Sequence, residues 1–331
     1  MASSIATVGT NWTWADRLGA AAVRCNVGRM RYHVAPGLYA VNEPGPDAPV
    51  FVSANYKLSF DHLRRALDGL SGWILVLDTK GINVWCAAGK GTFGTAELIQ
   101  RLEAVGLAQR VSHRTIIVPQ LGAPGVAAHE VHRQTGFRVV YGPVRARDLP
   151  AFLRNGMHAD ADMRTVRFRL TDRLAVAPVE LMLSAKYALL AAALWSIPAG
   201  WRPGGWTWST FPAQGGQAAA VFLAGYLLVG IAVPGLLPWL PGRAFSLKGT
   251  FAGLLVWLLL WALGPYTRVI DLAAWLILLG AVASFMGLNF TGASTYTSLS
   301  GVKKETRVAV PLIVVGLLAA LGLWLRACGV F

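Results

Sequence analysis

One cysteine lies in a segment whose neighbours are unusually small. The segment runs Asn83-Val84-Trp85-Cys86-Ala87-Ala88-Gly89-Lys90 and continues into Gly91 and Thr92. A lone cysteine is often a small buried hydrophobic residue without chemistry, but alanines and glycines add little bulk to a core. They would instead let a large flat ligand approach the backbone beside the Cys86 thiol. Lys90 and a place near the start of a helix would both favour the thiolate of Cys86.

Three other motifs in the same part of the chain match known sites incompletely. Residues 89–94 fit the spacing of a dinucleotide fingerprint, but that fingerprint belongs in a turn directly after a strand, and the nearest expected strand ends near Asp78. Val84 replaces the first glycine of a phosphate-binding loop. His129 and His132 are spaced i, i+3, whereas a zinc-protease helix needs i, i+4. We expect two histidines on a partly exposed helix.

The chain is too apolar and too unevenly charged for one soluble domain. Of its 331 residues, 55% are apolar and 14% are charged, and the formal net charge is +14. Residues 1–180 hold 21 Lys and Arg against 14 Asp and Glu, whereas residues 181–331 hold 9 against 2. The composition predicts a soluble domain over 1–160, a basic juxtamembrane linker over 161–180 and a transmembrane domain over 181–331.

Five apolar runs approach the roughly 20 residues that a membrane-spanning helix needs. They are Tyr187–Trp201, Ala218–Leu240, Gly249–Tyr266, Leu272–Phe290 and Val308–Leu325. The first is long enough only if Leu181–Leu183 join it and Lys186 reaches toward the headgroups. The pattern predicts an all-α transmembrane domain of about five helices, with four or six left open. Gly280, Ala283 and Gly287 share one helix face and suit close helix packing.

Basic residues near the ends of these runs predict the orientation. One side would carry Arg164, Arg167, Arg169, Arg173, Arg243, Lys248, Lys303, Lys304 and Arg307, and the other only Arg202, Arg268 and Arg326. The positive-inside rule then places the soluble domain in the cytoplasm and the C-terminus outside. Met1–Ala6 lack a basic region followed by an apolar core, so we expect no secretory signal. The sequence predicts a multi-pass protein of the cytoplasmic (inner) membrane.

Charge and cysteine content restrict the partners and cofactors. The basic excess lies largely beside the apolar runs, where anionic headgroups attract it. Membrane lipids, and not nucleic acid, are therefore the expected polyanionic partner. Cys25, Cys86 and Cys328 are the three cysteines, too few for an iron–sulfur cluster held by four cysteines of this chain alone. Any electrons that the reaction of this chain requires must therefore come from elsewhere.

The soluble part alternates between β-rich and helical patterns. Strands are expected at Val50–Ala54, Trp73–Leu77, Thr115–Val118 and Arg138–Tyr141, and helices at Ser59–Leu70, Ala96–Val105 and Val126–Thr135. This alternation predicts an α/β domain with a Rossmann-like parallel sheet. Such sheets bind ligands beyond the carboxyl ends of their strands. Four segments would converge there, containing Asn55 and Lys57, residues 79–90, Gln120 and Gly122, and Gly142.

The octapeptide Asn83–Lys90 resembles the cap-helix signature of the HgcA family, the mercury-methylating membrane corrinoid proteins. Val52–Asp61 is similar to a segment of the related corrinoid iron–sulfur proteins. The resemblance implies an N-terminal corrinoid-binding domain followed by a membrane domain, with a cobalamin-type cofactor. Cys86 would be, or lie close to, the lower axial ligand of the cobalt. The other implied cofactor contacts are Asn83, Val84, Trp85, Ala87, Ala88, Gly89, Lys90, Gly91 and Thr92 of the cap segment, and Asn55, Lys57, Gln120, Gly122 and Gly142 of the loops.

The implied activity is transfer of a methyl group from methyl-cobalt to mercury(II), forming methylmercury. A thiolate donates more electron density than an imidazole and would weaken the opposite cobalt–carbon bond, and mercury(II) is a soft acceptor. The implied electron donor is HgcB, a ferredoxin-like iron–sulfur protein. The methyl group would come from methyltetrahydrofolate or from an upstream methyltransferase.

Two other functions stay open at this point. The first is a membrane-anchored corrinoid carrier that passes methyl groups to a carbon or thiol acceptor. The second is a transporter with a cytoplasmic regulatory domain, since Pro234 and Pro238 interrupt the second apolar run. Five helices exceed what an anchor needs, so the membrane domain would also form a homodimer, hold the partner, or pass mercury.

Overall fold

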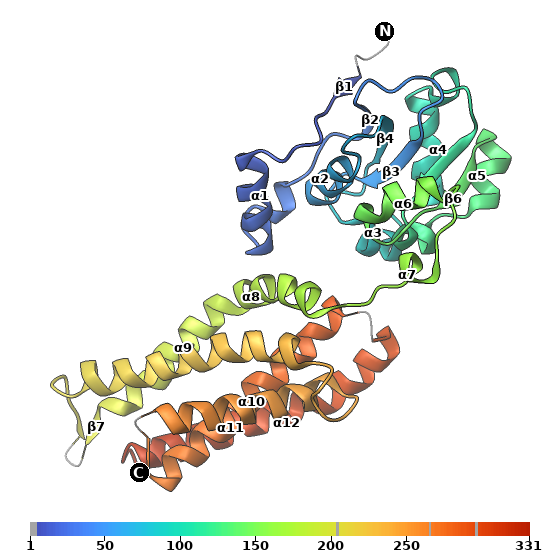
Figure 1. The fold of residues 1–331 in the computed structure, drawn as a ribbon. Coiled ribbons are helices and arrows are strands. Elements are labelled where there is room, and N and C mark those ends of the chain that lie inside the picture. Colours follow the sequence, from blue (N-terminus) through green and yellow to red (C-terminus); the bar gives the residue numbers. More distant parts are fainter. Residues whose placement is uncertain (1–4, 203–204, 265, 295–296) are drawn as a thin grey trace. The chain divides into compact units, whose positions relative to one another are not determined.

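A computed structural model describes residues 5–202, 205–264, 266–294 and 297–331 of the chain, which form two compact units (Figure 1). One unit runs to Val23 and continues over Val27–Arg167; the other contains Arg24–Asn26 and Phe168–Phe331. Residues 1–4 and 265, on which parts of our expectations for the N-terminus and the third apolar run rest, lie outside the described residues.

The first unit is built on a six-stranded, mostly parallel sheet. The strands are β1 (Ala6–Thr7), β2 (Gly37–Val41), β3 (Val50–Ala54), β4 (Gly72–Leu77), β5 (Thr115–Val118) and β6 (Arg138–Tyr141), in the order β1-β2-β4-β3-β5-β6. The pairs β3–β4, β3–β5 and β5–β6 are parallel, and β2 is antiparallel to β4. The four expected strands are present. The sequence did not indicate β1 and β2, because two residues carry no periodicity and the Gly-Leu-Tyr-Ala-Val run is poor in β-branched residues.

Helices cover both faces of this sheet (Figure 1). They are α1 (Trp14–Arg24), α2 (Lys57–Ala66), α3 (Val84–Lys90), α4 (Thr95–Ala104), α5 (Ala128–Thr135), α6 (Leu149–Arg154) and α7 (Ala161–Arg164), with short 3-10 helices between them. Val50, Val52 and Leu75 point into a core shared with α3, α4 and α5. Their neighbours Phe51 and Ile74 point into a second core shared with α2 and α6. The strands therefore alternate between two buried layers.

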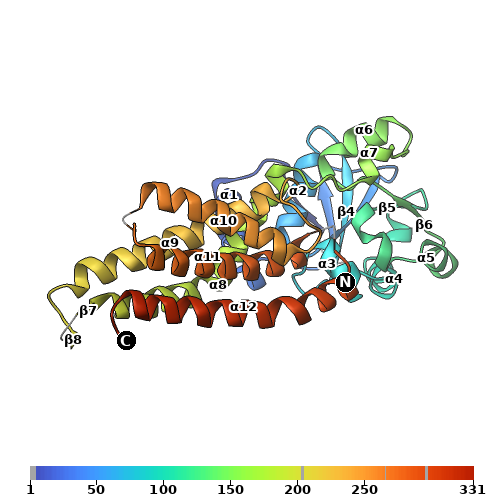
Figure 2. The same ribbon diagram turned by 90° about the horizontal axis from the view of Figure 1, so that it is seen from below.

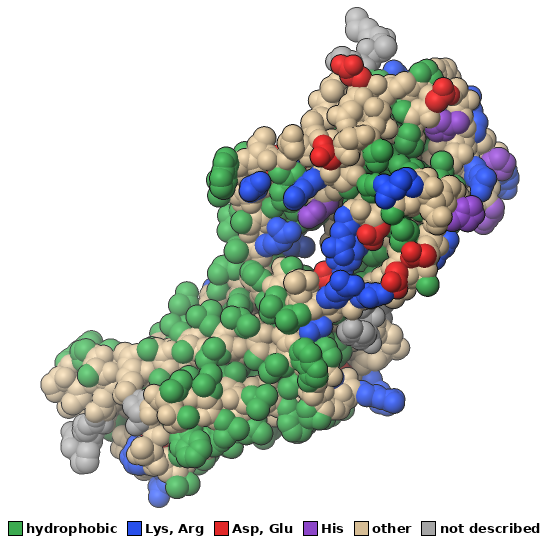
Figure 3. Space-filling view, in the orientation of Figure 1, with side chains coloured by type: hydrophobic (Ala, Val, Ile, Leu, Met, Phe, Trp, Pro, Cys, Tyr) green, Lys and Arg blue, Asp and Glu red, His purple; other side chains and the backbone are tan. Residues whose placement is uncertain are grey.

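The second unit is helical. It contains α8 (Leu170–Ser196), α9 (Phe211–Leu236), α10 (Phe245–Leu263), α11 (Val269–Phe290) and α12 (Leu299–Ala327), joined in part by a small hairpin of β7 (Trp201–Arg202) and β8 (Gly205–Trp206). Within the described residues, five helices are long and apolar enough to cross a membrane. They lie side by side (Figures 1 and 2), and hydrophobic side chains cover much of their surface (Figure 3). The predicted fold class, an α/β domain followed by about five membrane helices, is confirmed.

The first membrane helix begins earlier than its apolar run. The stretch 161–180, expected as a basic linker, contains α7 and the first residues of α8. The Asp172 carboxylate accepts a 2.9 Å hydrogen bond from the backbone N–H of Arg169, which caps the helix start. Glu180 and Lys186 interrupt the apolar run, whereas α8 continues through both residues, because Glu and Lys have favourable helix propensities.

Two helices of this unit pack backbone against backbone. A Cβ added at Gly249 of α10 would overlap the carbonyl oxygen of Ala283 in α11, and one added at Gly287 would overlap the carbonyl oxygen of Phe245. Glycine is therefore required at both contacts. The expected small-residue face is present at Ala283 and Gly287. Gly280 differs, because the nearest atom to an added Cβ is a Thr250 methyl 3.8 Å away.

Gly249→Ala is expected to destabilise the helical unit by about 1–3 kcal/mol, because the new methyl group overpacks the α10–α11 contact. The measurement is thermal unfolding of the full chain in detergent. Gly322→Ala in α12 is the control, since nothing lies within 4 Å of an added Cβ there. The control is expected to be neutral or stabilising, and equal destabilisation by the two substitutions would contradict the close contact.

Candidate functional site

The Cys86 thiol is held on the solvent-exposed side of α3. The Asn83 side chain begins this helix by accepting a 2.9 Å hydrogen bond from the backbone N–H of Cys86. Gly91 ends it in the left-handed conformation, with φ of 81°. Ala87 and Ala88 face inward and are buried, whereas Trp85, Cys86, Gly89 and Lys90 are exposed and Val84 is half-buried. The small residues thus serve two faces: alanines pack inward, and cysteine and glycine face outward.

The outer face of α3 has room for a ligand. An added Cβ would meet no atom within 4 Å at Gly89 or at Gly91. Gly89 is three residues after Cys86 and therefore lies on the same side of the helix. The helix backbone next to the thiol is consequently open to a broad, flat molecule. Thr92 follows, and its hydroxyl donates a long 3.5 Å hydrogen bond to the carbonyl oxygen of Ala87.

The inner face of α3 rests on the short 3-10 helix η3 (Gln120–Gly125). Phe93 is fully buried between them. A Cβ at Gly122 would overlap the Phe93 ring, and a Cβ at Gly125 would overlap the Phe93 carbonyl oxygen. Both glycines are required by this close approach. The sequence indicated Gly122 as a ligand contact; in this structure its hydrogen-only side chain makes room for Phe93.

Asn55 holds the loop that leads into α3. It follows β3, is 4% exposed, and its side-chain oxygen accepts hydrogen bonds from the Thr79 N–H, the Thr79 hydroxyl and the Gly81 N–H at 3.2, 2.8 and 2.9 Å. The amide nitrogen donates to Asp78 at 3.4 Å. Asn55 is therefore a positioning residue: it fixes residues 78–81, which lie just before the α3 cap.

Lys57 points into an ion network. Its amine contacts Asp16 at 2.5 Å and Asp61 at 2.6 Å, and Arg64 contacts the same two carboxylates at 2.7 and 2.8 Å. Arg64 also donates to the carbonyl oxygen of Gly9. The network ties the N-terminal segment and α1 to α2. Burial alone would raise the pKa of Asp16, but hydrogen bonds from Lys57, Thr13 and Arg64 outweigh it and hold that pKa well below its ordinary value.

Gln120 is the loop residue that most clearly lacks a partner. Its side-chain oxygen is buried and accepts no hydrogen bond within the described part of the chain. An unsatisfied buried acceptor costs about 1–3 kcal/mol, so a ligand that donates to it would be favoured. Gly142, by contrast, follows β6, where an added Cβ would lie 2.9 Å from an Ile117 methyl group. The absence of a side chain at Gly142 therefore allows close packing against Ile117.

The structure therefore brings together part of the expected set. One region contains Cys86, the open face at Gly89 and the loop fixed by Asn55. The 3-10 helix η3, which begins at Gln120, packs against the inner face of α3 in this region. The sequence interpretation missed Phe93 and Gly125, which set the distance between α3 and η3. It also missed the ion-pair partners of Lys57. Lys57 and Asp61 are spaced i, i+4, a signal of an ion pair that was available. Asp16 is far away in sequence and has no such signal.

Residues 89–94 join the end of α3 to the start of α4, and no strand precedes them directly. His129 and His132 are exposed on α5. Among the described residues, no three His, Cys, Asp or Glu side chains gather to hold a metal ion.

The α/β unit is similar in sequence to parts of known proteins. Residues 28–153, less than half of the chain, match the family described as CO dehydrogenase/acetyl-CoA synthase delta subunit. The chain is 35% identical over 118 residues to the acetyl-CoA decarbonylase/synthase complex subunit gamma of Archaeoglobus fulgidus, covering 35% of this chain and 25% of that protein. It is 30% identical over 117 residues to the corrinoid/iron-sulfur protein large subunit of Moorella thermoacetica, covering 35% and 25%. The subunit gamma of Methanocaldococcus jannaschii is 32% identical over 124 residues, covering 37% and 25%. The chain thus spans about a quarter of the length of these relatives, and the similarity supports a relationship to the corrinoid/iron-sulfur proteins.

Asp16→Asn is expected to destabilise the α/β unit by about 3 kcal/mol at neutral pH, because it leaves Lys57 and Arg64 without one of their two carboxylates. Since the pKa of Asp16 is lower in the folded chain than in the unfolded chain, ionised Asp16 stabilises the fold above about pH 4. That contribution is lost as the pH falls below 4 toward the folded pKa, by about 1.4 kcal/mol per pH unit.

The measurement is hydrogen–deuterium exchange of α1 and α2 in the full chain at several pH values. Glu103→Gln removes an exposed carboxylate of α4 and is the control. Equal exchange in the two variants at neutral pH would show that the network does not hold these helices.

Proposed function

We propose that the α/β unit binds a corrinoid over the outer face of α3, with Cys86 as or near the lower axial ligand of its cobalt, and that the protein methylates mercury(II). The carrying observation is an exposed thiol on a helix whose neighbouring outward positions have no side chain. The similarity of residues 28–153 to corrinoid proteins supports the cofactor. The resemblance of the octapeptide Asn83–Lys90 to the HgcA family supports mercury(II) as the methyl acceptor.

The residues of the site fit such a group. A corrin ring is broad and flat, and the backbone around Gly89 and Gly91 is open to it. Gln120 offers a buried acceptor without a partner. Because η3 packs against the inner face of α3, an amide donor of the ring periphery would satisfy it only from the edge of that helix. Cys86 would hold the cobalt, and Trp85 and Lys90 would lie beside the ring. When bound, the corrinoid would supply a cobalt-carried methyl group for transfer to a soft acceptor such as mercury(II), and the Cys86 thiolate would help to hold the cobalt.

The chain's own residues would position and support this chemistry. Asn83 holds the backbone of Cys86, and Asn55 fixes the loop before it. Ala87 and Ala88 anchor the helix inward, so that the thiol keeps its direction. Asn55 supports the site through its side-chain hydrogen bonds to the loop before α3, and Gly122 and Gly142 support it by leaving room for close packing.

We assign the supply of electrons and of the methyl group to partners outside this chain. A ferredoxin-like iron–sulfur protein, HgcB, is the proposed donor, because three separated cysteines cannot provide a four-cysteine cluster. Methyltetrahydrofolate or a methyltransferase is the proposed source of the methyl group.

The proposed location is the cytoplasmic (inner) membrane, with the α/β unit in the cytoplasm and the C-terminus outside. Arg243 lies in the loop between α9 and α10, and Lys248 lies in the first turn of α10. Lys303, Lys304 and Arg307 lie in the first turns of α12. These positions belong to the same side of the bundle as the start of α8, as the positive-inside rule requires. The predicted boundaries, 1–160 and 181–331, belong to this proposal.

A second candidate is a membrane-anchored carrier that passes the methyl group to a carbon or thiol acceptor. It is favoured by the names of the relatives, which are subunits of an acetyl-CoA decarbonylase/synthase complex. Offering the methylated protein mercury(II) and a thiol in parallel, and comparing the transfer rates, separates the two candidates.

Cys86→Ala is expected to change the ultraviolet–visible spectrum of the corrinoid bound to the purified full chain and to abolish methylmercury formation. Cys25→Ala removes another exposed thiol and is expected to behave as the wild type. Failure of all three proteins to retain a corrinoid would overturn the proposal. Retention of full methylation by Cys86→Ala would remove the role assigned to the thiol.

Gln120→Leu is expected to lower corrinoid affinity about five- to tenfold, the effect of losing one hydrogen bond. The same change is expected to leave the stability of the corrinoid-free protein unchanged or higher, because it removes a buried unsatisfied oxygen. The measurements are corrinoid titration and thermal unfolding, with Gln134→Leu on the exposed side of α5 as the control. Unchanged affinity would exclude Gln120 from the site.

A further inference from the structure

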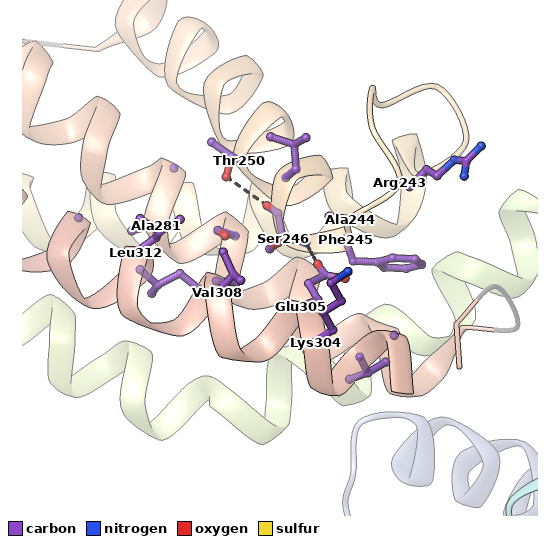
Figure 4. A pocket seen from close by; sticks show the side chains of 18 of the residues that line it. Arg243, Ala244, Phe245, Ser246, Thr250, Ala281, Lys304, Glu305, Val308 and Leu312 are labelled. Atoms are coloured by element: carbon purple, nitrogen blue, oxygen red, sulfur yellow. Dashed lines mark hydrogen bonds between the residues drawn. The ribbon is translucent and has the colours of Figure 1, made fainter. Parts of the chain in front are cut away.

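A cavity of about 980 Å³ lies between α10, α11 and α12 and opens to the outside of the bundle; all of its lining residues belong to the helical unit (Figure 4). This volume is at the upper end of the range found for ligand sites. The proposed methyl transfer uses none of its residues. Its wall is mainly apolar along most of its length. The charged lining residues Lys304 and Glu305 lie at one end, and Arg243 lies on the loop at that end with its side chain extending away from them (Figure 4).

The apolar wall is formed in part by side chains on the outer surface of the bundle. Val308 and Leu312 of α12 line the cavity and are 61% and 66% exposed. Leu254 of α10 and Ile277 of α11 line it from the other side. Gly280 and Gly316 also line it, and the absence of their side chains widens it. In a bilayer, such a wall is covered by hydrocarbon and not by water.

The polar end is formed by the starts of α10 and α12. Glu305 accepts a 2.6 Å hydrogen bond from the backbone N–H of Ser246, so its charge faces the positive end of α10. Lys304 lies beside Glu305, and Arg243 extends from the loop before α10 (Figure 4). Within the described part of the chain, neither cation forms an ion pair with a carboxylate. Because the helix end balances Glu305, the mouth carries uncompensated positive charge.

The length of the cavity matches one leaflet. Its lining on α12 extends from Gly301 to Gly316, roughly 22 Å at 1.5 Å per residue. Half of a hydrocarbon core of about 30 Å, plus one interfacial layer of about 6 Å, is roughly 21 Å. A cationic mouth at headgroup depth and an apolar wall of leaflet depth together fit one amphiphile with a negative head.

We propose that this cavity binds one acidic phospholipid, with the phosphate at Lys304 and Arg243 and an acyl chain along α12 over Gly280 and Gly316. The bound lipid fills the space between α10 and α12, which the close α10–α11 contact leaves open. This site is independent of the corrinoid and can be tested without it.

The experiment is native mass spectrometry of the full chain in detergent, titrated with phosphatidylglycerol or phosphatidylcholine. We expect one phosphatidylglycerol to bind at least tenfold more tightly than phosphatidylcholine. Arg243→Ala/Lys304→Ala is expected to lose that preference, since each basic residue near an anionic headgroup contributes to its binding. Lys303→Ala/Arg307→Ala removes the same charge from the same end of the bundle, outside the cavity, and is expected to retain it.

A second variant tests the apolar part. Gly280→Leu fills the cavity without altering charge, and no atom within 3.8 Å of the added Cβ opposes it. We expect it to bind phosphatidylglycerol at least tenfold more weakly while remaining folded by circular dichroism. Unchanged lipid binding in this variant, or equal losses in the two double variants, would overturn the proposal. A lipid-free dimer that Gly280→Leu dissociates would also overturn it, because a second copy would then occupy the cavity.

Discussion

The distance between α3 and η3 is the constraint on which the candidate site depends. Phe93 fills the space between them, and Gly122 and Gly125 leave only backbone on the η3 side. A seven-residue helix is too short to be stable alone. Its stability must come from this packing, from the Asn83 cap and from the loop that Asn55 holds. Small residues next to a reactive side chain therefore have two roles, because the inner ones make the helix possible and the outer ones leave it accessible.

Contacts made directly with the backbone also hold the helical unit together. Gly249 and Gly287 bring α10 and α11 together, and basic side chains satisfy the carbonyl groups at the end of α9. Arg173 donates to the Pro234 carbonyl oxygen at 2.7 Å, and Lys248 donates to those of Leu237 and Leu240 at 2.8 and 2.6 Å. Arg173 and Lys248 thus have a structural role besides the membrane orientation that their positive charges predict. Where they lie at a helix end, the same charges that favour one side of a membrane also satisfy orphan carbonyl groups.

Local patterns predicted those elements that bury a continuous apolar face. β3, β5 and β6 were expected with their observed bounds, since each is a short run rich in β-branched and aromatic residues between turn residues. The starts of α1 and α8 were not indicated, because an exposed Trp14 and the charges around Arg169 obscure any apolar periodicity. The exposure of Cys86 and Gly89 follows from helical spacing. The direction of Lys57 does not, because it depends on Asp16, which chain topology alone brings near.

The division of α3 into an inner and an outer face bears on how a thiol can be both fixed and reactive. Burial would fix Cys86 but would exclude a ligand and disfavour the charged thiolate. Exposure without support would leave its position undefined. Here the cap bond is made by the Cys86 backbone and the packing by Ala87 and Ala88, so neither uses the sulfur. Changing the side chain at this position therefore removes the chemistry without removing a contact on which the helix depends, and any large loss of function at Cys86 belongs to the thiol itself.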